Sequence, residues 1–210
     1  MRYRLFMAIT WFLAASLVHG GAYEDIIKAA NDGDTETVVD LLKRGMDINT
    51  ADGTGTTLLM IAVHTGNASL AHTLLGNRAN VNRRNQFGDS ALLIAALKGR
   101  SEVAKALIEK GADMNPSGWT PLHYAVFGGN FEVAALLIAK GAKLDGRAPN
   151  GQTPLMIAVK QGRLDFVKQL IDADADMDLT DSEGKSALGL ARKLGHEEIV
   201  TYLKKAGAVG

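Results

Sequence analysis

The side chains best suited to metal binding or acid–base chemistry in this 210-residue chain are four histidines and a run of aspartates. His64 and His72 are eight residues apart, and a turn at Gly66 is expected between them. They therefore do not form the i, i+4 pair that holds a metal on one helix. His123 and His196 lie in other segments. We expect no metal site among these histidines.

The aspartates alternate with other residues, as calcium ligands often do. They are Asp172, Asp174, Asp176 and Asp178. An EF-hand loop needs glycine at its sixth position and glutamate at its twelfth. Counted from Asp172, these positions hold Met177 and Glu183, so the glycine is missing. Neither G-x-S-x-G nor H-E-x-x-H occurs. We therefore expect no catalytic residues, no metal and no cofactor.

Composition narrows the class of protein further. The chain has no cysteine, which excludes disulfides, thiolate metal sites and a cysteine nucleophile. Without Arg2 and Arg4, which precede an apolar segment, 21 basic side chains stand against 23 acidic ones. A nucleic-acid or anionic-membrane surface needs an excess of clustered lysine and arginine. We therefore expect neither a nucleic-acid partner nor a membrane-binding surface.

Any functional side chain must be positioned by short helices. Thr120-Pro121 is typical of a helix start, because the threonine hydroxyl can accept a backbone N–H and proline at the first position loses no bond. Gly129 suits the left-handed end of that helix, and a second helix follows up to Gly141. Two helices of about nine residues do not stand alone in water. The unit therefore needs copies of itself on either side.

Those copies are visible as a Gly-x-(Thr/Ser)-x-Leu pattern. Its hydroxyl residues are Thr57, Ser90, Thr120, Thr153 and Ser186, at spacings of 33, 30, 33 and 33 residues. Glycines between the paired helices follow the same step at Gly33, Gly66, Gly99, Gly129, Gly162 and Gly195. A period of 33 with the sequence T-P-L-H-x-A is the ankyrin signature. Residues 120–125, 153–158, 111–115 and 141–145 match that pattern, and the chain resembles the ankyrin-repeat family from about Tyr23 to Ala208.

This resemblance implies an all-α solenoid of about six helix-turn-helix repeats with hairpin fingers. The repeat domain is expected over residues 23–210, with caps near 23–50 and 184–210. In this family the histidine at the position of His123 has a structural hydrogen-bonding role. Tyr124, Phe131 and Phe166 are expected in the core. Ankyrin proteins generally bind partners on the concave face, so a non-enzymatic binding module is implied.

Residues 1–22 do not fit the repeat and predict a signal peptide. Arg2 and Arg4 precede an apolar run of 14 residues, and small residues follow up to Ala22. Cleavage is expected before Tyr23, with cleavage after Gly20 as the alternative. An uncleaved membrane anchor is the other interpretation, but 14 helical residues rise about 21 Å against a hydrocarbon core of roughly 30 Å. Export to the bacterial periplasm is the resulting expectation.

Two departures from the repeat stand out. The position that follows the second helix, usually glycine in a left-handed conformation, is Arg78 in repeat two and Asp174 in repeat five. Between Asn115 and Gly118 only two residues remain, where neighbouring repeats have five. We therefore expect a shortened finger and a notch in the row of fingers.

Partner-binding residues are expected on the fingers and on the exposed side of the first helices. The candidates are Arg84, Phe87, Leu97, Lys98, Trp119, Phe127, Arg147 and Lys160. The apolar members would form a cluster rimmed by basic ones, which is typical of an interface centre and favours an acidic partner. For Trp119 two interpretations stay open: contact with a partner, or filling of the gap left by the short finger.

Similar secreted bacterial ankyrin proteins suggest two roles. The first is a protective, immunity-like protein that inhibits an exported hydrolase. The alternative is a periplasmic oxidative-stress factor associated with catalase and peroxide defence. In both, the chain is expected to be a monomer that engages one protein partner, and to contact a membrane only through an uncleaved leader.

Overall fold

A computed structural model describes residues 21–209 of the chain. The predicted signal peptide, residues 1–22, lies outside the described residues except for Gly21 and Ala22. The described part is helical, and its only extended pairings are isolated bridges between Ala51 and Thr57 and between Thr180 and Ser186. None of the described helices combines the length and apolar character needed to span a bilayer. The predicted all-α helical repeat is thus confirmed.

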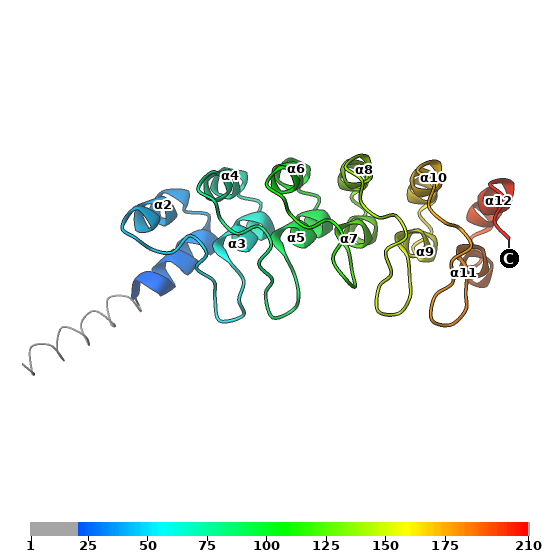
Figure 1. The fold of residues 1–210 in the computed structure, drawn as a ribbon, viewed down its shortest axis with the longest axis horizontal. Coiled ribbons are helices and arrows are strands. Elements are labelled where there is room, and N and C mark those ends of the chain that lie inside the picture. Colours follow the sequence, from blue (N-terminus) through cyan, green and yellow to red (C-terminus); the bar gives the residue numbers. More distant parts are fainter. Residues whose placement is uncertain (1–20, 210) are drawn as a thin grey trace, which may run out of the picture. The chain divides into compact units, whose positions relative to one another are not determined.

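The chain divides into two compact units between Gly88 and Asp89. Figure 1 labels the helices of both units. In the first unit, helical residues 21–32 are followed by α2 (Thr35–Lys43), α3 (Leu58–Thr65) and α4 (Ala68–Gly76). The second unit holds α5 (Ala91–Lys98), α6 (Ser101–Glu109), α7 (Pro121–Gly128), α8 (Phe131–Ala139), α9 (Pro154–Lys160), α10 (Leu164–Asp172), α11 (Ala187–Leu194) and α12 (Glu197–Lys205). Within this unit the first helices of the repeats form one row and the second helices another.

Helix starts follow the predicted caps. In all five cases the hydroxyl accepts the backbone N–H three residues further on, at 3.2 to 3.4 Å. The capping residues are Thr57, Ser90, Thr120, Thr153 and Ser186. Each cap satisfies an N–H that has no partner inside the helix. These contacts confirm the register that the spacing predicted.

Helix ends also agree with the sequence. Gly129 ends α7 in the left-handed region with φ of 74°. Arg78 and Asp174, which replace glycine after α4 and α10, adopt φ of 65° and 68°. Both residues therefore adopt the left-handed backbone conformation that glycine has at the same position of other repeats. Local repeat geometry overrides the residue's own preference at these two positions.

The core of the second unit lies between its two rows of helices. Leu107, Leu122, Leu137 and Leu155 are at most 1% exposed. Phe166 on α10 is equally buried, as predicted. Such burial of large apolar side chains supplies most of the stability that short helices lack by themselves.

Phe131 contradicts its predicted place in the core. It is the first residue of α8, and 45% of its side chain is exposed. One edge of its ring packs on Phe166, with ring centres 5.4 Å apart. The ring contact that covers part of Phe131 comes from the following repeat. Tyr124 on α7 is half-buried.

The fingers are numbered by repeat, so the second to sixth contain Gly55, Gly88, Gly118, Gly151 and Gly184 in turn. All of them close in the same way except the fourth. A backbone N–H of glycine donates to the carbonyl three residues earlier at Gly55, Gly88, Gly151 and Gly184. In the part of the chain that the structure describes, the stretch from Asn115 to Gly118 has no such turn bond. The three missing residues are those that would form the tip. This confirms the shortened finger.

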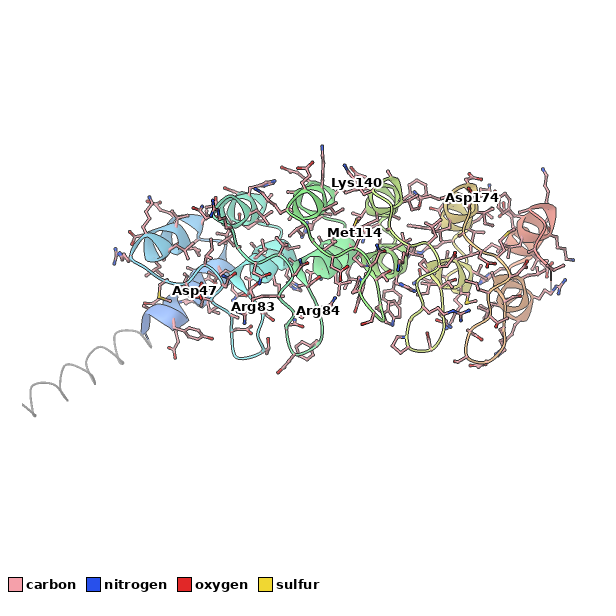
Figure 2. All side chains as sticks on the ribbon, viewed as in Figure 1. Asp47, Arg83, Arg84, Met114, Lys140 and Asp174 are labelled. Atoms are coloured by element: carbon pink, nitrogen blue, oxygen red, sulfur yellow. The ribbon has the colours of Figure 1, made fainter. Side chains whose placement is uncertain are left out.

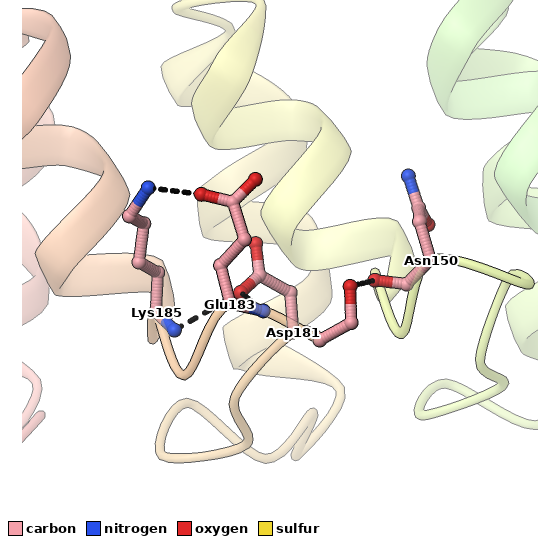
Figure 3. Close-up of polar contacts among 5 residues, drawn as sticks. Asn150, Asp181, Glu183 and Lys185 are labelled. Atoms are coloured by element: carbon pink, nitrogen blue, oxygen red, sulfur yellow. Dashed lines mark hydrogen bonds and ion pairs between the residues drawn. The ribbon is translucent and has the colours of Figure 1, made fainter.

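Backbone hydrogen bonds also join certain neighbouring fingers. Within the first unit, Gln86 N donates to Thr54 O at 2.9 Å. Within the second unit, Ser182 N donates to Asn150 O at 3.1 Å, and the Ser182 hydroxyl donates to the same oxygen (Figure 3). The residue of the fifth finger that corresponds to Ser182 is Pro149, which has no N–H. The fifth finger therefore cannot make the same bond to the shortened fourth.

Candidate functional site

An open pocket of about 250 Å³ lies beside the shortened finger, within the second unit. Its walls come from the start and end of α7, from the fifth finger and from α9. They are Trp119, Phe127, Asn150, Gln152, Ile157, Lys160 and Gln161. We call this the notch pocket. Three of the predicted partner-binding residues, Trp119, Phe127 and Lys160, thus line one pocket.

Trp119 packs on the helix that it precedes. Its ring centre lies 5.6 Å from His123, 5.3 Å from Tyr124 and 5.9 Å from Phe127, the last in an edge-to-face arrangement. The indole therefore occupies part of the space beside the shortened finger. It stays partly exposed and lines the notch pocket. Trp119 therefore fills part of the gap left by the short finger, and it also leaves part of its ring exposed for contact with a partner.

His123 forms the support beneath this ring. It is fully buried, and its Nε2 lies 3.0 Å from the carbonyl oxygen of Gln152. Because a carbonyl can only accept, Nε2 carries the proton and Nδ1 accepts from the Thr120 backbone N–H at 3.2 Å. Burial lowers the pKa of His123, and the bonds to the carbonyls of Gln152 and Gly146 oppose that shift only in part. The ring is therefore held neutral, as a bridge between α7 and the fifth finger.

The burial of His123 predicts a pH-dependent stability. In the unfolded chain its pKa returns to about 6.5, so the unfolded chain binds the proton more readily. The free energy of unfolding is expected to fall as the pH decreases from about 7 to about 5. Urea unfolding at pH 7, 6 and 5 should show the stability advantage of the native chain over His123→Met shrinking. A pH-independent advantage would contradict a neutral buried ring.

The wall contributed by the fifth finger is held in place from both sides. Asn150 Oδ1 accepts the backbone N–H of Gln152 at 3.2 Å, and Asn150 O accepts both bonds from Ser182. On the α9 side, Gln161 Nε2 donates to the carbonyl of Phe127 at 3.2 Å. These bonds exist before any ligand arrives. The pocket is therefore largely preorganised, which reduces the entropy lost on binding.

The four predicted basic residues are not equivalent. Arg147 Nη1 donates to Thr180 O at 2.7 Å, so this guanidinium ties the fifth finger to the sixth. Arg84, in the chain leading into the third finger (Figure 2), donates to Gly88 O at 2.8 Å. Lys98 and Lys160 have no hydrogen bond or ion pair within residues 21–209. The arginine guanidinium groups are therefore held by carbonyl oxygens, whereas the two lysine ammonium groups have no such contact to give up on binding a partner.

The sixth finger carries both signs of charge. The Glu183 carboxylate accepts from the Lys185 ammonium (Figure 3), and this bond holds the pKa of Lys185 above its ordinary value. The neighbouring Lys185 in turn lowers the pKa of Lys193. Glu183 therefore balances part of the positive charge at this end of the row. No acidic side chain lines the notch pocket around Lys160.

The remaining candidates lie outside the notch pocket. Leu97 and Lys98 end α5, and the carbonyl of Leu97 accepts from Asn130 Nδ2 at 2.8 Å. Phe87 lies at the tip of the third finger, in the first unit, with 70% of its side chain exposed. Of the predicted cluster, the structure thus brings Trp119 and Phe127 into contact and places Lys160 in the same pocket.

Ile157 is a pocket residue that the sequence interpretation missed. It is 4% exposed and was indistinguishable from a core residue by its helical spacing. Its register, four residues after the cap, also holds Tyr124 in repeat four. The tyrosine at this register was a signal in the sequence, because a tyrosine hydroxyl usually needs a polar partner or solvent. In the structure Tyr124 is half-buried and its hydroxyl donates to Asp89.

The aspartate run has structural contacts. Asp176 N donates to Asp145 Oδ1 at 3.0 Å, and Asp176 Oδ1 accepts from Asp178 N at 2.9 Å. Asp178 Oδ1 in turn accepts from Val209 N. Over residues 21–209, no group of three histidine, aspartate or glutamate side chains has the arrangement of a metal site. The carboxylates instead bind backbone amides of the loops.

Comparison with known proteins agrees with the repeat geometry. A family model described as ankyrin repeats, in three copies, matches residues 26–116, 59–148 and 143–209. None of the curated proteins matches the chain. Ankyrin repeats are protein-interaction modules and are typically not enzymes. The matches together cover nearly all of the described residues, and the chain belongs to the ankyrin-repeat family.

Proposed function

We propose that this protein acts by binding one protein partner at the notch pocket, and not by catalysis. The observation that carries the proposal is the exposed aromatic wall of that pocket: Phe127 is 50% exposed and Trp119 packs edge-to-face against it. Aromatic residues around a preorganised recess are the usual centre of a protein interface. Repeats of this family supply such surfaces.

We further propose where the protein binds its partner and what binding does to that partner. The expected leader directs the chain to the bacterial periplasm, and binding there would protect the cell by inhibiting an exported hydrolase. An inhibitor of this kind needs only to cover its target. A preorganised pocket suits that task. The proposed protein is a monomer, and the available charge at Lys98 and Lys160 favours an acidic target surface.

Phe127→Ala is expected to weaken partner binding by about 30-fold, because truncation of a central aromatic costs about 2 kcal/mol at an interface. The partner would first be captured from the exported fraction with the native chain and identified by mass spectrometry. Isothermal titration with the purified partner then gives the affinity of each variant. The loss should appear mainly as faster dissociation.

Phe131→Ala is the matched control. This ring is exposed to a similar extent, 45%, but lies on a second helix away from the notch pocket. Its removal should leave affinity within about twofold of the native value. Equal losses in the two variants would contradict binding at the pocket. The inhibitory role is tested separately by assaying the purified partner with and without the chain, and a partner without hydrolase activity would overturn that part.

A further inference from the structure

The notch pocket combines an apolar recess with one uncompensated positive charge. Trp119, Phe127 and Ile157 supply the apolar walls. The Lys160 ammonium at the end of α9 has no ion-pair partner among residues 21–209, and none of the lining residues is acidic. The Phe127 carbonyl, which would otherwise repel an anion, already accepts from Gln161 Nε2. The pocket therefore favours a ligand that is apolar at one end and anionic at the other.

The size of the recess limits the ligand to a single side chain. At about 250 Å³ it falls below the range of roughly 300–1,000 Å³ found for pockets that enclose drug-sized molecules. Trp119 and Phe127 form an edge-to-face pair whose rings stay partly exposed in the pocket. A third aromatic ring can pack against these exposed surfaces in an edge-to-face or offset-stacked arrangement. A flat aromatic side chain thus fits the recess better than a branched aliphatic one.

We infer that the notch pocket receives an aromatic side chain from an exposed loop of the partner, and that an aspartate or glutamate next to it in sequence pairs with Lys160. This inference rests on the proposed function and specifies the recognition chemistry of the same pocket. Charge complementarity selects the acidic neighbour, because Lys160 is the only charged residue among those that line the pocket. The pocket is open to solvent beside the short fourth finger, so a loop of the partner can reach it.

Tetrapeptides can test this without knowledge of the partner. The full chain carrying Trp11→Phe has Trp119 as its only tryptophan, so its fluorescence reports occupancy of the pocket. Acetyl-Gly-Phe-Asp-Gly-amide should bind about threefold more tightly than its Phe-Asn counterpart, which has the same shape without the charge. The Ala-Asp peptide should not bind detectably. Raising the salt concentration should reduce the difference between Phe-Asp and Phe-Asn.

Two variants separate the charge from the recess. In Lys160→Met, which keeps the length of the side chain, the Phe-Asp and Phe-Asn peptides should bind equally. In Phe127→Ala, both should bind much more weakly. Equal binding of the two peptides to the native pocket, or a preference that survives Lys160→Met, would overturn the inference. If the partner is still lost on Phe127→Ala in that case, the proposed function stands while its assigned chemistry fails.

A second copy of this chain is the competing occupant. Light scattering measures the mass of the free protein at the concentrations used for the titrations. A monomer mass supports the inference. A dimer that dissociates on Phe127→Ala would assign the notch pocket to self-association and overturn it.

Discussion

Phe166→Ala is expected to lower the free energy of unfolding by about 4 kcal/mol, since removal of a fully buried phenylalanine costs about 3–5 kcal/mol. Phe166 is 1% exposed on α10. Its ring supports Phe131, and the Arg163 guanidinium lies over it at 5.7 Å. Alanine would leave a cavity between two repeats. Urea unfolding followed by far-ultraviolet circular dichroism measures the change.

The control for this prediction is the other ring of the same pair. Phe131→Ala removes a side chain that is 45% exposed, so it should cost only about 1 kcal/mol. The two substitutions delete the same atoms and break the same ring contact. They differ only in how much surface the native chain shields from water. Equal losses would mean that Phe131 is as buried in solution as Phe166.

His123→Ala is expected to cost about 3 kcal/mol. The substitution leaves a cavity and removes the acceptor of the Thr120 N–H, which is buried. Gln152 O also loses the bond from His123 Nε2, although it keeps the one from Ala148 N. A buried polar group without a partner costs about 1–3 kcal/mol by itself. Urea unfolding at pH 7, where the native ring is neutral, provides the measurement. A loss below 1 kcal/mol would show that the bridge to the fifth finger contributes little.

His123→Met separates packing from hydrogen bonding at this position. The corresponding residues of repeats two and five are Met60 and Met156, both 1% exposed, so the fold accommodates methionine here. Its side chain fills the space but cannot donate to Gln152 O. We expect roughly half the loss seen with alanine. A methionine variant as stable as the native chain would assign the whole effect to packing.

The repeat itself was predictable because it is encoded locally. A hydroxyl that caps a helix, such as Thr120, and a glycine that ends one, such as Gly129, act within one turn of chain. Even the exceptions at Arg78 and Asp174 could be located, since the period fixes which backbone conformation each position must adopt. The short fourth finger followed from counting residues.

The walls of the pocket and the contacts of the charged side chains were harder to predict from the sequence. Whether Arg147 is available depends on the position of the Thr180 carbonyl, which belongs to the next finger. The exposure of Phe131 depends on a single neighbouring ring from the following repeat. Ile157 lines the pocket beside the shortened fourth finger, which lies more than 30 residues earlier in the chain. Such properties arise between repeats, and the pattern within one repeat does not contain them.

Because Pro149 has no N–H, the links between successive fingers of the second unit are not all of the same kind. Pulling the sixth finger away from the fifth must break the bond from Ser182 N to Asn150 O. At the fourth finger the fifth makes no such backbone bond among the described residues, while the His123 bridge anchors its base. The fifth finger is therefore joined to the fourth repeat through side chains such as His123, and to the sixth finger through a backbone bond as well.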